Sequence, residues 1–145
     1  MPYGMRKWLG TAVASIASLA VAACLFLMYF SAFPGGEKEY YLFSASSQAE
    51  RKETLSVGDL FAVCGESAVY VADSGRDSAS IAKEIRERYA AEILFTETVG
   101  DTVSYYCHSS GLGEGIILNG CLINLHIAVR TDSVAVGTPI IFGGY

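Results

Sequence analysis

The sequence predicts an α+β domain, a two-layer sandwich of two helices on an antiparallel sheet of about five strands, preceded by one transmembrane helix. Three observations support this class. An uncharged run of 26 residues, Trp8–Phe33, lies near the start of the chain. Apolar residues then recur at helical spacing in two segments before residue 91 and at the alternating spacing of strands after it. This order places both helices on one face of the sheet.

The apolar run is long enough to cross a membrane. As a helix it would reach roughly 39 Å, which exceeds the ~30 Å hydrocarbon core of a bilayer. Arg6 and Lys7 precede it, and positive charge stays on the cytoplasmic side, so residues 1–7 are predicted to be cytoplasmic. We therefore predict a single-pass plasma-membrane protein with a signal-anchor over 8–33, a linker over 34–46 and an extracytoplasmic domain over 47–145.

Two processing alternatives stay open. Ala20-Val21-Ala22 fits a signal-peptidase site, but cleavage there would leave the apolar segment Leu25–Phe30 near the new N-terminus. Val21–Cys24 resembles a lipobox, which would make the chain a lipoprotein anchored through Cys24, although no small polar residues follow that cysteine. The uncleaved anchor is the interpretation that we adopt.

Small side chains recur at every fourth residue of the apolar run. Such a stripe lets two membrane helices approach closely, so the anchor is a candidate for homodimerisation. The alternative is chance spacing in an alanine-rich segment. The residues of this candidate dimer stripe are Gly10, Ala14, Ser18 and Ala22.

The first helix of the domain is expected over 48–64. Ser47 and Glu50 have the spacing of a capping box, and the apolar residues between Val57 and Cys64 share one helical face. Gly65 then suits the position after a helix end.

The second helix is expected after a turn at 73–76. Asp77 or Ser78 can cap its first turn, and Ile81, Ile85 and Tyr89 lie on one face at spacing four. Charged residues cover the opposite face and include the pair Glu84 and Arg88, whose order is the favourable one for an i,i+4 ion pair.

Strands are expected at 67–72 and from residue 93 onward. Val99-Gly100-Asp101 indicates one hairpin turn, and Asn119-Gly120 suits the type I′ turn of a second hairpin. Residues 123–130 alternate apolar and polar, which places His126 on a polar surface. The last strand, 134–142, contains Pro139, which cannot donate to a ladder and favours an edge position.

An edge strand can pair with another chain, because it presents unpaired N–H and C=O groups. Residues 134–145 contain no charge that would block such pairing. We therefore predict a partner edge there for an envelope protein or a second copy of the chain. The alternative is that the tail folds back into its own sheet or lies beneath the first helix. The residues of the candidate edge are Val134, Val136, Thr138 and Ile140.

The charge balance opposes a nucleic-acid partner. From Glu37 onward the chain has eight Lys or Arg residues against fifteen Asp or Glu residues, a formal charge of −7. Binding to phosphate backbones needs clustered basic residues instead.

No residue pattern indicates catalysis or a cofactor. Cys107 and His108 are consecutive strand residues that point to opposite faces, so the histidine cannot readily activate the thiol. The loop Gly111–Gly115 is followed by β-branched residues and not by the helix that a phosphate site needs. The residues that a metal would have to gather, without the spacing of a known motif, are Cys107, His108, Glu114, Cys121 and His126.

The extracytoplasmic cysteines are expected to be free. If Asn119-Gly120 forms a two-residue turn, Cys107 and Cys121 lie about two strands apart, near 10 Å, which is too far for a disulfide. Together with Cys64 they are then expected to act as small buried hydrophobes.

Three segments of the C-terminal half resemble the YwmB-like family. They are Val103–Tyr106, Asn124–Ala128 and Gly137–Ile141, with a closing aromatic at Tyr145. The resemblance covers Ser47–Tyr145 and implies a fold like that of the TATA-box-binding protein, in a secreted or anchored protein of endospore-forming Firmicutes. It implies an envelope role, possible links to sporulation, and no catalytic residues.

The function predicted from the sequence is a non-enzymatic interaction module of the cell envelope, without a cofactor. The alternative is an enzyme, or its accessory domain, that acts on cell-wall polymers. Such enzymes use paired carboxylates, and the acidic residues in predicted turns are Asp101, Glu114 and Asp132.

Overall fold

A computed structural model describes residues 3–142, with side chains described for 4–26 and 31–142. The chain forms two compact units, Met1–Ala32 and Phe33–Tyr145. Phe33 is fully buried in the second unit, so the folded domain begins at the end of the predicted anchor.

The first unit is the helix α1 (Tyr3–Phe30). Within it, Gly4–Phe26 is long and apolar enough to span a membrane, with 23 residues and a mean hydropathy of 2.1. The hydroxyl groups of Thr11, Ser15 and Ser18 donate to the carbonyl groups four residues earlier, at 2.7–2.9 Å. Such bonds satisfy polar side chains inside the helix, as an apolar surrounding requires.

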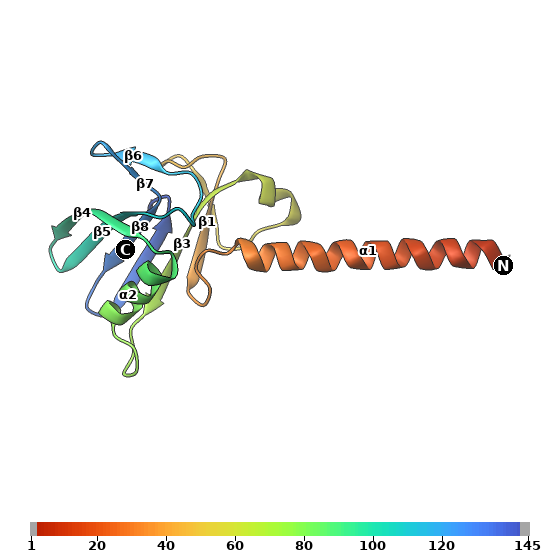
Figure 1. The fold of residues 1–145 in the computed structure, drawn as a ribbon, viewed down its shortest axis with the longest axis horizontal. Helices are drawn as coiled ribbons and strands as arrows, with labels where there is room; N and C mark the ends of the chain where they lie inside the picture. The colour runs from red at the N-terminus through yellow and green to blue at the C-terminus, as the bar shows by residue number, and fades with distance from the viewer. Residues whose placement is uncertain (1–2, 143–145) are drawn as a thin grey trace. The chain divides into compact units, whose positions relative to one another are not determined.

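The second unit is an α+β domain built on a seven-stranded antiparallel sheet (Figure 1). The strand order is β2-β1-β3-β9-β8-β5-β4. The strands of this sheet are β1 (Glu37–Leu42), β2 (Glu50–Lys52), β3 (Val63–Val71), β4 (Glu92–Val99), β5 (Thr102–His108), β8 (Leu125–Val129) and β9 (Ser133–Thr138). A separate hairpin pairs β6 (Ile116–Leu118) with β7 (Cys121–Ile123).

The sheet is larger than the sequence predicts because two segments form strands that carry no strong strand pattern. Residues 34–46, expected to be a linker, contain β1, which pairs with β2 and β3. The expected helix over 48–64 is wrong: the segment forms β2, the 3-10 helix η1 (Val57–Ala62) and the start of β3. One helix, not two, therefore covers the sheet.

Gly65 explains part of this difference. It lies in β3 and not at a helix end, and a Cβ atom there would lie 2.5 Å from the carbonyl oxygen of Thr138. The capping interaction also lies elsewhere, because Asp59 accepts hydrogen bonds from the backbone and side chain of Ser56. The apolar residues at 57–64 have helical spacing, but they lie in the 3-10 helix η1 and in the first residues of β3.

The helix α2 (Ser78–Arg88) confirms the second predicted helix. Asp77 caps it by accepting a 2.7 Å hydrogen bond from the amide of Ser80. The predicted pair of Glu84 and Arg88 is present at 3.0 Å. α2 lies against β8 and β9, and Ile81 and Ile85 are buried there.

Both predicted hairpin turns are confirmed. Gly100 lies in the turn between β4 and β5 with φ +62°, and Asn119 and Gly120 join β6 to β7 with φ values of 50° and 76°. Two consecutive left-handed residues are what a type I′ turn requires, and asparagine and glycine adopt this conformation most readily.

The two faces of the sheet are covered differently. The face beneath α2 forms the main apolar core. The segment after β9 folds back over the opposite face, where the amide of Phe142 donates to the hydroxyl of Tyr41 and the two rings meet edge to face at 5.1 Å. The buried core residues beneath α2 are Ala68, Cys107, Leu125, Ile127, Val134 and Val136.

The prediction of an edge at 134–142 is wrong. β9 lies between β3 and β8, with Ala68 and Ile127 flanking Val136. Val134 and Val136 are fully buried, and Thr138 and Ile140 are half-buried. A strand without charges can lie at the centre of a sheet as well as at an edge. β9 is central because it pairs with β3, which lies more than 60 residues earlier in the chain. The strands at the two edges are β2 and β4.

Candidate functional site

Cys107 and His108 lie on opposite faces of the sheet, as expected for consecutive strand residues. Cys107 points toward α2, on the face shared with Leu125, whereas His108 lies on the opposite face, opposite Glu92. Burial raises the pKa of the Cys107 thiol to about 11, so the sulfur stays protonated and is a poor nucleophile at neutral pH. This thiol fits the expected role of a small buried hydrophobe, but the same expectation is wrong for Cys64, which is exposed, and Cys121 is only half-buried.

The described residues contain no group of three or more His, Cys, Asp or Glu side chains that could hold a metal ion. The candidates from the sequence are divided between the two faces of the sheet and the β6–β7 region. His126 and Cys107, for example, lie on opposite faces of adjacent strands.

His126 is buried, with 2% of its surface exposed, so its prediction as a surface residue is wrong. Its ring stacks on Tyr106 at 4.4 Å, and Tyr106 stacks on Phe95 at 4.5 Å. Nδ1 of His126 accepts a long hydrogen bond, 3.4 Å, from the amide of Ile141. Burial lowers the pKa of His126 to about 4, so the imidazole is neutral at physiological pH. The segment after β9 covers His126. The alternation of polar and apolar residues along β8 carries no information about this segment, so the sequence pattern predicts an exposed ring.

A second buried polar group organises the glycine-rich loop. The side chain of Asn124 accepts from the amide of Ser109 at 2.8 Å and donates to the carbonyls of Ser109 and Gly113 at 2.7 and 3.0 Å. Gly115 approaches the chain so closely that a Cβ would lie 2.3 Å from the carbonyl oxygen of Ile123. The loop is therefore held rigidly as a connection, and β6 follows it, as expected for a segment that is not a phosphate loop.

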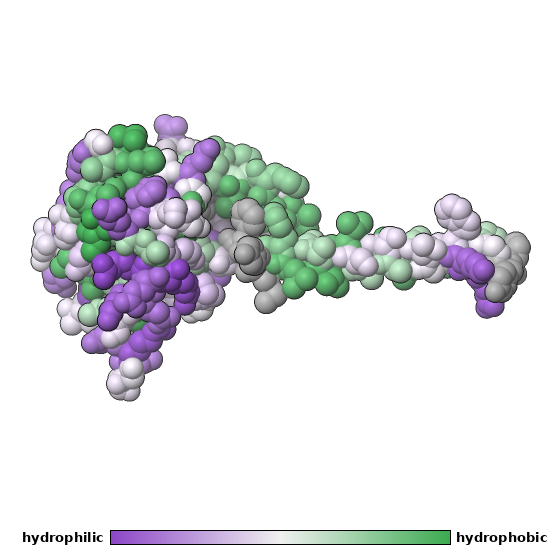
Figure 2. Space-filling view, viewed as in Figure 1, coloured by the Kyte–Doolittle hydropathy of each residue, from purple (hydrophilic) through white to green (hydrophobic). Residues whose placement is uncertain are grey.

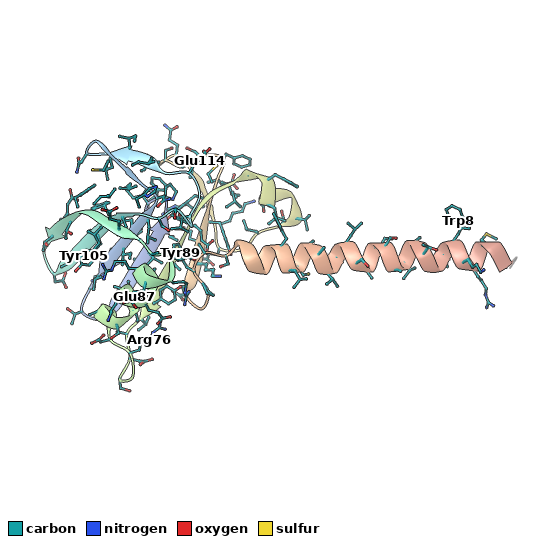
Figure 3. The ribbon with its side chains drawn as sticks, viewed as in Figure 1. Trp8, Arg76, Glu87, Tyr89, Tyr105 and Glu114 are labelled. Atoms are coloured by element: carbon teal, nitrogen blue, oxygen red, sulfur yellow. The ribbon has the colours of Figure 1, made fainter. Side chains whose placement is uncertain are left out.

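The three turn carboxylates do not meet at one point. Asp101 and Asp132 lie in the β4–β5 and β8–β9 turns, which share one end of the sheet because Val103 pairs with Val129. Glu114 lies beyond the other end of β5, a strand of seven residues, or roughly 20 Å. Figure 3 shows Glu114 beside β6, far from Arg76 at the opposite end of the domain.

The two sheet edges differ in how much backbone they offer. β2 has three residues, and its Arg51 and Lys52 form ion pairs with Glu39 and Asp59 at 3.7 and 3.0 Å. β4 has eight residues and one strand neighbour, β5, within the described part of the chain. β4 therefore offers the longer edge for the addition of another strand. The residue pattern of β4 does not predict that it lies at an edge of the sheet.

In comparisons with known proteins, no family model, curated protein or solved structure matches the chain. The resemblance to the YwmB-like family therefore stays a prediction. The features of this chain that bear on function are its apolar helix, its sheet edges and its exposed surface.

Proposed function

We propose that the chain is a membrane-anchored, non-enzymatic binding module whose domain works outside the cytoplasm. The apolar helix α1 supports the anchor, and Arg6 and Lys7 at its start favour a cytoplasmic N-terminus. The acidic domain and the resemblance to the YwmB-like family agree with a role in the cell envelope of a Firmicute. The candidate stripe of small residues in α1 would add a homodimer contact.

The observation that carries the binding role is the edge strand β4. Most of its residues are exposed, including Thr96, Glu97 and Thr98. It has no Lys and no Pro, the residues that most often block edge pairing, and its charges are Glu92 and Glu97. A partner segment that added here would gain backbone hydrogen bonds, and basic side chains on it would pair with the two carboxylates.

Lysine substitution on β4 tests this role. We expect Thr96→Lys with Thr98→Lys to abolish the partner adduct formed by a photo-reactive residue at Val99 in intact cells, because the new charges oppose a basic incoming strand. Ser74→Lys, in an exposed turn after β3, is the control for a lysine added away from β4 and should leave the adduct intact. A thermal melt of each variant separates lost binding from lost folding. If the double variant is folded and the adduct persists, β4 is not the binding edge.

A further inference from the structure

Three large apolar side chains form an exposed surface at one end of the domain. Phe61 is 96% exposed, Phe43 is 71% exposed and Val57 is 70% exposed. Figure 2 shows hydrophobic surface over η1, which carries two of the three residues. We call Phe43, Val57 and Phe61 the apolar tip. Exposed aromatic residues that gather in this way mark a surface that contacts another apolar phase.

The apolar tip is held in place by specific contacts. The amide of Phe43 donates to the carbonyl of Ala62 at 2.8 Å, which joins the end of β1 to the end of η1. Asp59 accepts hydrogen bonds from Ser56 at 2.9 and 2.8 Å and pairs with Lys52 at 3.0 Å. These contacts tie η1 to β2, so the exposed rings stand on an ordered platform.

Phe43 has a backbone conformation that is costly for its residue type. Its φ is +64°, in the left-handed region, which bulky side chains rarely adopt. Glycine would fit this position without strain and would not expose a ring. Residues held in such a backbone conformation often serve a function. For Phe43, that function would be contact between its exposed ring and something outside the domain.

The chain enters the domain beside the middle of β3. The amide of Phe33 donates to Glu66 on β3 at 3.2 Å, four residues after the end of η1. The chain then runs along β3, because Pro34 accepts a hydrogen bond from Tyr70, and reverses into β1. α1 ends only three residues before Phe33, a span of at most roughly 11 Å.

A second apolar feature lies at the end of the sheet that carries the apolar tip. β5 ends at His108, and the β6–β7 hairpin that follows exposes Ile117 and Leu122. The polar turns of β4–β5 and β8–β9 lie at the opposite end. The domain therefore exposes apolar side chains at the end that carries the apolar tip, whereas the opposite end carries these polar turns together with the exposed Val71 and Val99.

We propose that the apolar tip inserts into the lipid leaflet that borders the domain and fixes how the domain stands on the membrane. The inference rests on the proposed function, because it requires α1 to remain as the anchor. A tether of three residues makes insertion an intramolecular event, so a few apolar side chains are enough to hold the domain at the interface. A protein partner could cover the same surface, but only the bilayer is brought to it by the chain itself.

Tryptophan quenching in the full-length chain tests the insertion. The sequence has one tryptophan, Trp8, so Trp8→Phe gives a silent background into which Phe61→Trp is introduced. The matched control is Val99→Trp, because Val99 is 76% exposed but lies five strands from β1, roughly 24 Å away, and at the opposite end of the sheet. The chains are reconstituted into phosphatidylcholine–phosphatidylglycerol vesicles with brominated acyl chains.

We expect Phe61→Trp to show blue-shifted emission and at least threefold stronger quenching than Val99→Trp. Equal quenching at both positions, in a chain that floats with the vesicles after alkaline extraction, would overturn the insertion and leave the anchor standing. A chain that does not float would overturn the anchor and the insertion with it.

Phe43→Gly supplies a variant in which folding is not at risk. In the chain that carries Phe61→Trp, this change should at least halve the quenching, because one of the two inserted rings is lost. The thermal midpoint should stay within a few degrees, since glycine suits the left-handed backbone at this position. Undiminished quenching would remove Phe43 from the inserted surface.

Discussion

Acidification from pH 7 to pH 4 is expected to lower the unfolding free energy of the domain by roughly 3 kcal/mol through His126 alone. Its folded pKa, about 4, lies below the ordinary value of 6.5, because burial disfavours the imidazolium. The unfolded state therefore takes up a proton first as the pH falls. The contribution of His126 to stability is complete above about pH 6.5, declines as the pH falls toward 4, and is fully lost only below the folded pKa.

Urea denaturation of residues 33–145 at several pH values measures this effect, with His126→Phe as the control. Phenylalanine keeps an aromatic ring beside Tyr106 and does not titrate, so its stability should change much less between pH 6.5 and pH 4. Asp59 and Asp77 do not confuse the comparison, since both proteins contain them and hydrogen bonds to Ser56 and Ser80 hold their pKa values below the ordinary carboxyl value. Parallel pH profiles of the two proteins would contradict the burial of a neutral histidine.

Asn124→Ala is expected to destabilise the domain by about 3 kcal/mol or more, because each buried group left without a partner costs about 1–3 kcal/mol. The substitution removes the partner of the Ser109 amide and of the carbonyls of Ser109 and Gly113. Chemical denaturation monitored by tyrosine fluorescence measures the loss.

Ser133→Ala is the control for the asparagine experiment. Its hydroxyl bonds to the exposed side chain of Asp132, so its removal should cost less than about 1 kcal/mol. If Asn124→Ala were as mild as this control, Asn124 would not organise the loop that leads to the β6–β7 hairpin.

The parts of the fold that the sequence predicted depend on neighbouring residues. α2 was found because Asp77 caps it and its apolar residues lie on one face, and the Asn119-Gly120 turn was found because both residues tolerate positive φ. α1 was found from length and composition alone. In each case a few consecutive residues carry the whole signal.

The parts that were wrong depend on residues distant in the chain. Val57 and Phe61 have helical spacing, but the segment is built as η1 between two strands because β3 pairs with both β1 and β9. In the sequence, Gly65 suits the position after a helix end. In the structure it lies in β3, where the carbonyl oxygen of Thr138 comes so close that only glycine fits.

The same limit applies to the candidate site. β9 was expected at an edge because it contains no charge, whereas it is the central strand that long-range pairing places between β3 and β8. His126 was expected at the surface because the C-terminal segment that covers it cannot be foreseen from alternation. The β4 edge and the apolar tip depend on strand order and on exposure, which are set by residues far apart in the chain.

The central claim is that α1 anchors the domain outside the cytoplasm, and protease digestion of intact protoplasts followed by mass measurement tests it most directly. We predict a membrane-bound chain of full mass, 15.5 kDa, that is cut back to a fragment containing α1. Cys24→Ser should behave identically, because the anchor is the helix and not a lipid on that thiol. A domain protected from protease, or a chain released from the membrane with its first 22 residues missing, would contradict the account.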